Sequence, residues 1–329
     1  MGGDVVRDVI DEVLEFSVVG SFSRIGYLAR RRLYHWSKDA ERLDGKVVVV
    51  TGATSGLGRE AATSFAHAGA HVVMVVRDGE RGARVRGEIV ALTGNELVDV
   101  ITADLGDLDS TRAGAAELQK YGAINVVVHN AGSLQRTRQL NAQGLELTAV
   151  VHLLAPFLLT RLLTRELEAG RARVIWVSSG GMYSQSLDVD ALEMGEQGYD
   201  GVKAYARVKR AQVSLVAWWA PELLKRGITM VAMHPGWADT PGVRTSLPTF
   251  RRLMGPLLRS SAQGADSIVW LATCHERVAP GGLWLDRRPR PAHRMVKTRI
   301  SDSQRERERL WNYCVSRTEP DVHLHDGDV

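Results

Sequence analysis

The sequence predicts an α/β protein with a doubly wound parallel β-sheet and helices on both faces. Short apolar runs rich in β-branched residues recur along the chain, and each one is typical of a buried strand. A helical pattern follows most of these runs, and polar or glycine-rich motifs stand where the predicted strands end. Strands that alternate with helices in this way favour a parallel sheet. We expect one such domain, behind a helical extension formed by residues 1–44.

The composition excludes several classes of protein. The 329 residues are 44% apolar and 24% charged, which is typical of a soluble globular protein. A formal net charge of +4 is too small to predict a nucleic-acid partner. Cys274 and Cys314 are the only cysteines, so we expect no disulfide framework, no metal site and a reducing, cytoplasmic location. No apolar run reaches transmembrane length.

The extension contains two amphipathic segments. The first has six apolar residues on one helical stripe and acidic residues on the opposite side. The apolar residues are Val5, Val6, Val9, Ile10, Val13 and Leu14. The second, around residues 24–36, mixes arginines with apolar and aromatic residues, a pattern that can lie on a membrane surface. The acidic first helix argues against anionic lipid. The alternative is that both helices pack on the domain or on another subunit of a homo-oligomer. We expect the extension to be dispensable for cofactor binding.

The first strand unit carries a nucleotide-binding signal. Val47 to Val50 reads as a strand, a glycine loop follows, and a helical pattern ends at Gly69. Glycines let the backbone approach a ligand closely, and the helix N-terminus suits a pyrophosphate. The alternative is a plain glycine-rich turn. The cofactor contacts expected here are Gly52, Thr54, Ser55, Gly56, Leu57, Gly58 and Arg59.

The Thr-Gly-x-x-x-Gly-x-Gly spacing from Thr51 to Gly58 resembles the short-chain dehydrogenase/reductase superfamily in its classical form. The resemblance covers roughly residues 45–290 and implies a Rossmann-like NAD(P)-binding domain, here residues 45–300, with oxidoreductase activity. The Ser-Ser-Gly-Gly-Met motif, the 26-residue separation of Ser179 from Tyr205 and the motif after His234 look most like the dehydrogenase/reductase member 12 group.

The end of the second strand, residues 71–76, bears on the choice of cofactor. Arg77-Asp78 follows this strand, where the fold places the adenosine ribose. A carboxylate there would bind the 2′-hydroxyl, whereas an arginine can pair with a 2′-phosphate. Arg77, with Arg59 nearby, favours NADP(H). The alternative is that Asp78 takes the ribose and that NAD(H) binds.

Three later strands, at residues 98–102, 124–128 and 228–233, also end in motifs of the family. The resemblance assigns these motifs to the adenine ring, to the sheet beside the cofactor, and to the nicotinamide with the phosphates. The expected contacts are Asp104 and Leu105, then Asn130, Ala131 and Gly132, and finally Pro235, Gly236 and Thr240.

The catalytic signal combines Ser179, after strand 174–177, with Tyr205 and Lys209 on the following helix. The Tyr-x-x-x-Lys spacing puts both side chains on one helical face. A nearby ammonium favours the phenolate and lowers the pKa of the tyrosine, which makes it a general acid/base. Ser179 can hold the substrate oxygen, and the resemblance has Tyr205 and Lys209 also contact the cofactor. A lone Tyr-x-x-x-Lys is usually an ordinary amphipathic helix, but here the other motifs precede it in order.

His152 departs from the family. It lies on the predicted helix 142–169, where the resemblance implies an asparagine that completes the catalytic set through its backbone carbonyl and a bound water. A histidine can keep the carbonyl and change the side-chain contacts. The alternative is a core histidine.

We therefore predict an NADP(H)-dependent oxidoreductase that moves a hydride between the nicotinamide and a small-molecule carbonyl or alcohol. The apolar surroundings, with residues 241–260 as a loop-like lid, suggest a lipophilic substrate such as an aldehyde, ketone, retinoid or steroid. The alternatives are a nucleotide-binding scaffold or redox sensor with little turnover, and a peripheral-membrane adaptor that uses residues 1–44. Residues 301–329 are expected to form a charged helix and a polar tail.

Overall fold

A single eight-stranded sheet forms the centre of the computed structural model, which describes residues 2–37, 41–246 and 248–319. The strand order is β3-β2-β1-β4-β5-β6-β7-β8, and all neighbours are parallel except the β7–β8 hairpin. The strands are β1 Val47–Thr51, β2 His71–Val76, β3 Val98–Thr102, β4 Val126–His129, β5 Arg173–Val177, β6 Thr229–Met233, β7 Leu283–Leu285 and β8 Arg288–Arg290. The chain winds outward from β1 in both directions, which confirms the doubly wound parallel sheet.

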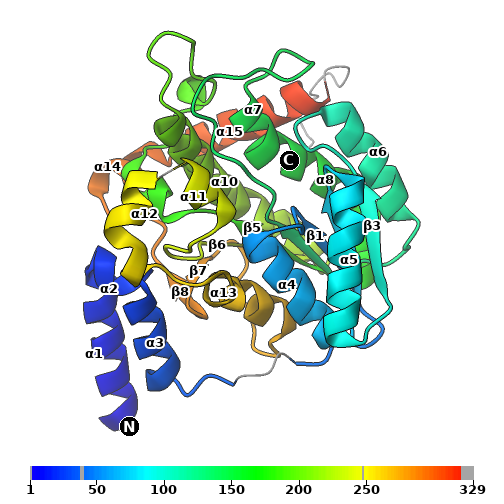
Figure 1. Cartoon of the computed structure of the whole chain (residues 1–329). Coiled ribbons are helices and arrows are strands. Elements are labelled where there is room, and N and C mark those ends of the chain that lie inside the picture. The colour runs from blue at the N-terminus through cyan, green and yellow to red at the C-terminus, as the bar shows by residue number, and fades with distance from the viewer. Residues whose placement is uncertain (1, 38–40, 247, 320–329) are drawn as a thin grey trace.

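Helices cover both faces of the sheet (Figure 1). One apolar core contains α4 (Gly56–His67), α5 (Gly79–Thr93) and α13 (Ser261–Thr273). The other contains α6 (Leu108–Gln119), α8 (Ala155–Leu162), α10 (Gly201–Lys225) and the C-terminal α15 (Gln304–Thr318). Successive strand residues point to opposite faces: Val48 and Val50 lie in the first core, whereas Val49 lies in the second. The sheet is therefore buried on both sides, as continuous valine runs predict.

The predicted helix 142–169 is shorter and broken. It begins as α7 (Leu147–Ala149), passes through a π-helical turn η1 (Val150–Leu154) into α8, and ends as α9 (Thr164–Gly170). Asn141 prevents an earlier start, because its Oδ1 accepts the backbone N–H groups of Gln143 and Leu145 in a turn. The Glu146 carboxylate then caps α7 through the Ala149 N–H.

The predicted loop 241–260 is largely helical, in α11 (Pro241–Ser246), α12 (Pro248–Met254) and the 3₁₀ turn η4 (Gly255–Leu257). Each α-helix starts with a proline, which suits the first helical position. Arg244 of α11 and Arg251 of α12 both pair with Asp239, so this lid is held to the loop after β6. Two further 3₁₀ turns, η2 (Gly180–Ser184) and η3 (Val189–Ala191), follow β5, and α14 (Val296–Ser301) precedes α15. The predicted polar end, residues 320–329, lies outside the described residues.

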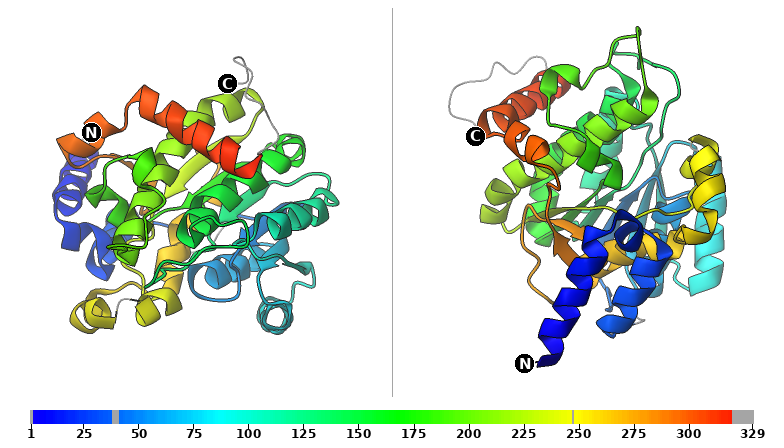
Figure 2. Two further views of the ribbon diagram at one scale, coloured as in Figure 1. Left: turned by 90° about the horizontal axis from the view of Figure 1, so that it is seen from above. Right: turned by 90° about the vertical axis from the view of Figure 1, so that its left-hand side faces the viewer.

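The N-terminal extension forms α1 (Gly2–Phe16), α2 (Val18–Phe22) and α3 (Arg24–Leu33) at the β8 end of the sheet (Figures 1 and 2). Arg30 of α3 is fully buried and pairs with Asp11 and with Asp286 of the β7–β8 turn. Among the described residues, no single helix is long and apolar enough to cross a membrane. Two helical segments, Leu147–Leu162 and Thr164–Gly170, are bent by 67° at the break between them. Together they meet the length and composition of a membrane span, and only those two criteria.

Candidate active site

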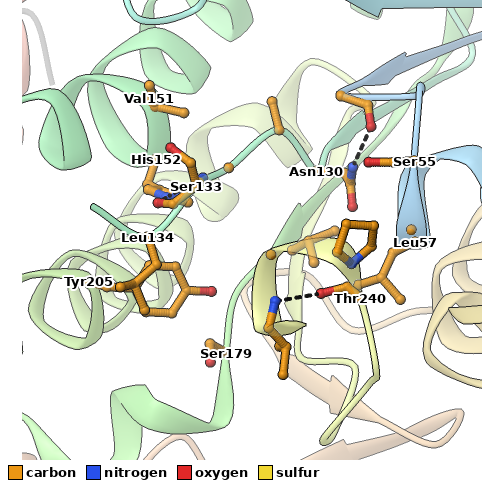
Figure 3. Close-up of a pocket in the computed structure, with 18 of the residues that line it drawn as sticks. Ser55, Leu57, Asn130, Ser133, Leu134, Val151, His152, Ser179, Tyr205 and Thr240 are labelled. Atoms are coloured by element: carbon orange, nitrogen blue, oxygen red, sulfur yellow. Dashed lines mark hydrogen bonds between the residues drawn. The ribbon is translucent and has the colours of Figure 1, made fainter. Parts of the chain in front are cut away.

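A pocket of about 590 Å³ opens at the carboxyl ends of the strands, where ligands bind in open α/β sheets. The loops after β1 to β6 and the lid helices contribute to its wall. Figure 3 shows His152, Ser179 and Tyr205 on one side of it, and Ser55, Leu57 and Asn130 on the other. Strands far apart in the sequence thus bring the predicted motifs together.

The glycine loop is fixed against the loop that follows β4. Gly52 has φ +68°, and a Cβ there would lie 2.8 Å from the Ala131 Cα. Asn130 Nδ2 donates to the backbone oxygens of Thr51 (3.0 Å) and Gly52 (3.3 Å). At Gly58 a Cβ would lie 2.4 Å from that same Nδ2. Gly58 therefore serves the packing of the loop, and it does not line the pocket.

The end of the pocket after β2, where such folds place the adenosine ribose, carries two arginines. Arg77 and Arg81 both line it, and sequence reasoning missed Arg81, which lies one helical turn beyond Arg77. Asp78 instead caps α5, because its Oδ1 accepts the Arg81 N–H at 3.0 Å. Arg59 is not brought to the pocket: it pairs with Glu88 at 2.8 Å on the outer side of α4.

Tyr205, Ser179 and Lys209 meet between β5 and α10. Asp200 caps α10 through the N–H groups of Val202 and Lys203, so the helix starts four residues before Tyr205. Ser178 Oγ donates to the Lys209 carbonyl (3.0 Å), and Lys209 Nζ donates to the Val177 carbonyl (2.7 Å). These two bonds clamp α10 to the end of β5. The Ser179 side chain acts as a hydrogen-bond partner of the Tyr205 hydroxyl, an interaction that favours a lower pKa of the tyrosine.

The pKa values of this group differ from the sequence prediction. Burial raises the pKa of Tyr205 to about 12, although the Ser179 hydrogen bond opposes the rise. Burial also lowers the pKa of Lys209 to about 7. The prediction that Lys209 lowers the pKa of Tyr205 is therefore wrong for this structure. The reason is that the Lys209 amine binds the Val177 carbonyl and that desolvation disfavours both charged forms.

The comparisons identify the family. The model of the short chain dehydrogenase family matches residues 46–249, more than half of the chain. The chain belongs to the short-chain dehydrogenase/reductase family. Dehydrogenase/reductase SDR family member 12 of Bos taurus is 38% identical, covering 82% of this chain and 85% of that protein. Human retinol dehydrogenase 11 is 36% identical, and the match covers 69% of this chain and 72% of that protein. The expected likeness to the member 12 group is confirmed, and the chain is a dehydrogenase/reductase.

Solved structures agree with this assignment. A Mycobacterium paratuberculosis protein is 25% identical with a TM-score of 0.69, and the match covers 88% of this chain and 99% of that one. A Beutenbergia cavernae structure with bound NADP at low occupancy is 28% identical with a TM-score of 0.58, and the match covers 70% of this chain and 91% of that one. The 3-ketoacyl-(acyl-carrier-protein) reductase of Brucella melitensis, complexed with NADH, is 27% identical (TM-score 0.58, 73% and 96%). The fold thus binds NAD(P)(H).

Most of the family positions predicted from sequence line the pocket. They are Gly52, Thr54, Ser55, Gly56, Leu57, Arg77, Asp104, Leu105, Asn130, Ala131, Gly132, Ser179, Tyr205, Lys209, Pro235, Gly236 and Thr240. Gly58 and Arg59 do not. The prediction missed apolar lining residues, among them Val151, Trp237 and Phe250, because no short motif marks them.

His152, the departure from the family, is both buried and part of the pocket wall. Its Nε2 lies 2.8 Å from the Ser133 carbonyl oxygen. Its ring packs edge-on against the ring of Tyr205, with 5.1 Å between the ring centroids. Burial and the charge of Lys209 hold the pKa of His152 well below its usual range. The neutral imidazole fits here because Gly132 has no side chain: a Cβ there would lie 2.3 Å from the His152 Cε1.

The His152 carbonyl accepts a hydrogen bond from the Gln212 side chain. In a regular helix this carbonyl would accept the N–H of the residue four positions later, but Pro156 has none. The π-helical turn η1 includes His152. Sequence reasoning missed Gln212, although Pro156 and the position of Gln212 one turn beyond Lys209 were readable signals.

The extension packs against loops that form the candidate active site, which the sequence did not indicate. Phe22, at the end of α2, packs on His234 and Trp237 at 4.8 and 5.9 Å between ring centroids. A Cβ at Gly180 would lie 2.6 Å from the Phe22 ring. The Phe22 carbonyl also accepts the Trp237 N–H at 2.8 Å. Phe22 thus contacts the loops that follow both β5 and β6.

Proposed function

We propose that the protein is an NADP(H)-dependent oxidoreductase acting on a lipophilic carbonyl or alcohol. The observation that carries the cofactor preference is the pair of arginines at the ribose end. Arg77 and Arg81 line the pocket there, while Asp78 is engaged as the cap of α5. Two guanidinium groups suit a 2′-phosphate, and a carboxylate committed to a helix cap is poorly placed to bind a 2′-hydroxyl.

The pocket residues fit such a cofactor. The glycine loop turns where a side chain would collide with the Ala131 backbone, and it leads into the N-terminus of α4. That arrangement suits a pyrophosphate. NADP(H), when bound, supplies or accepts the hydride at its nicotinamide.

Tyr205 exchanges the proton in the proposed reaction. Its phenol, held by Ser179, donates a proton to the substrate oxygen during reduction and recovers it during oxidation. Ser179 positions that oxygen at the end of β5. Lys209, clamped to the Val177 carbonyl, positions Tyr205 through the shared helix. Gln212 holds the backbone at His152, whose ring packs against Tyr205.

The substrate preference rests on the wall beside Tyr205. Leu134, Val151, Val202, Trp237 and Phe250 line the pocket there, and Phe250 belongs to the lid helix α12. Apolar and aromatic linings of this kind suit lipophilic ligands with few polar groups. We therefore propose a ketone or aldehyde with a sizeable apolar body.

Titration calorimetry with NADPH and NADH tests the cofactor preference. We expect tighter binding of NADPH, and we expect Arg77→Asp to reduce that advantage by about 1.5–3 kcal/mol, because a charge-assisted bond is lost. Arg59→Asp is the matched control, since Arg59 pairs with Glu88 outside the pocket, and it should leave the preference unchanged. Equal affinities of the unmodified protein for the two cofactors would refute the preference for NADP(H).

A further inference from the structure

Helix α1 is turned with its acidic side toward the body of the protein. Asp11 is only 3% exposed and pairs with Arg30 at 2.6 Å and with Arg290 at 2.9 Å. Glu15 pairs with Arg30 at 3.0 Å and also with Arg294. An ordinary surface helix buries its apolar stripe and exposes its charges. Helix α1 does the opposite.

The apolar stripe of α1 consequently faces outward. Val6, Val9, Val13 and Phe16 are 58%, 53%, 67% and 93% exposed, and their spacing puts them on one side of the helix. Ile25 and Leu28 of the neighbouring α3 are 55% and 43% exposed. We call these six residues the outer face of the extension. Helices α1 and α3 lie side by side away from the sheet (Figures 1 and 2).

Several arginines are among the described charged residues of α1 and α3 beside the outer face. Arg24 and Arg32 of α3 are exposed, and Arg32 lines a hollow between α1 and α3 together with Arg7 and His35. The acidic residues of α1 are largely neutralised, since Asp8 pairs with Arg288 at 2.9 Å and Asp11 and Glu15 pair with buried arginines. Glu12 is an exposed acid at the border of the stripe.

We propose that the outer face of the extension binds the surface of an anionic phospholipid membrane. An exposed apolar stripe flanked by arginines matches the acyl boundary and the charged headgroups of such a surface. The acidity of α1, which argued against anionic lipid at the level of sequence, is directed into the protein. A second copy fits less well, because twofold pairing through α3 would bring the arginines of the two copies together.

This face is connected with the active site through α2. Phe22 ends α2 and packs on Trp237, which in turn contacts Phe250 of the lid at 5.5 Å between ring centroids. The proposed membrane contact does not depend on the proposed reaction. If both hold, the membrane contact and the pocket are linked through Phe22 and Trp237.

Flotation of the 329-residue chain with vesicles tests the proposal. We expect binding to phosphatidylcholine vesicles that contain phosphatidylserine, and weaker binding to phosphatidylcholine alone. The double variant Val9→Asp/Val13→Asp should reduce binding by more than about tenfold, because the apolar stripe is interrupted. The matched control is Leu92→Asp, since Leu92 is 73% exposed on α5, and it should bind as the parent does.

A second pair of variants tests the charges. Arg24→Glu should lower the affinity for the anionic vesicles at least about fivefold, whereas Arg84→Glu, also exposed but on α5, should not. Circular dichroism and sedimentation velocity of each variant establish that the fold and the oligomeric state are retained. Absence of parent binding to anionic vesicles, or equal binding by the Val9→Asp/Val13→Asp variant, would overturn the proposal. A parent dimer that this variant dissociates, without vesicle binding, would assign the face to a second copy.

Discussion

Burial decides the protonation of the proposed catalytic residues. The pKa of Tyr205 is raised to about 12 and that of Lys209 is lowered to about 7, and both shifts favour the neutral forms. A neutral phenol held by Ser179 is prepared to donate a proton to a carbonyl oxygen. Tyr205 is thus in the form that the proposed reduction requires.

The lowered pKa of Lys209 predicts a dependence of stability on pH. An unfolded lysine has a pKa of about 10.4, so the unfolded chain binds more protons than the folded chain between pH 7 and pH 10. Below pH 7 the burial of Lys209 lowers the free energy of unfolding by its full amount, and this loss of stability becomes smaller as the pH rises. Relative to Lys209→Met, the parent should gain about 2 kcal/mol in free energy of unfolding from pH 7 to pH 9. Urea unfolding of both proteins at the two pH values measures this gain, and a constant difference between them would contradict it.

The sequence was most informative where a function depends on local spacing. Tyr205 and Lys209 share a helical face by their separation alone, and Ser179 follows a recognisable strand. The bond from Lys209 to the Val177 carbonyl could not be predicted, because it depends on how α10 packs on β5. The position of Arg59 outside the pocket could not be predicted for the same reason: nearness in sequence to the glycine loop did not indicate that it pairs with Glu88.

At the scale of elements, the extension and the β7–β8 hairpin are joined through a buried ion cluster. Asp286 and Arg287, at the hairpin turn, have φ values of +54° and +57°, a backbone region that residues other than glycine adopt uncommonly. The Asp286 carboxylate accepts hydrogen bonds from Arg30 at 2.8 Å and from Arg259 at 2.5 and 2.9 Å. The amphipathic pattern of α1 did not indicate this cluster, because such a pattern usually predicts that the apolar side of the helix is buried.

Asp286→Ala should be strongly destabilising. It leaves Arg30 and Arg259, both almost fully buried, without their shared carboxylate, and breaking a buried pair in this way costs about 3–5 kcal/mol. Asp44→Ala is the control, because the Arg42–Asp44 pair is exposed on the surface and should cost less than about 1 kcal/mol. Denaturant unfolding compares the two variants. Similar losses in both would show that the buried cluster contributes little to stability.

At the scale of the whole molecule, the doubly wound sheet was predictable because each strand and helix carries its own periodic signal. The contacts between the extension and the candidate active site could not be predicted. They depend on Phe22 and on the backbone oxygens of residues 21–23, which accept hydrogen bonds from Arg259, and no local pattern marks such contacts.

The structure therefore argues against the expectation that the extension is dispensable. A chain beginning at Arg42 would lose Phe22 from the loops after β5 and β6 and Arg30 from Asp286. We expect this truncation to unfold at a lower denaturant concentration and to bind NADPH at least about tenfold more weakly, because the nicotinamide end of the pocket loses support. Calorimetry on the folded truncated protein measures this effect. Parent-like affinity would show that the extension serves another purpose.

The exchange of a proton by Tyr205 is the central claim, and single-turnover oxidation of NADPH with a lipophilic ketone or aldehyde substrate tests it most directly. Tyr205→Phe keeps the ring that packs against His152, so NADPH affinity measured by calorimetry should stay close to that of the parent. The rate should fall by about 10²- to 10⁴-fold, the usual contribution of general acid catalysis. A Tyr205→Phe protein that binds NADPH normally and reacts at the parent rate would contradict the mechanism.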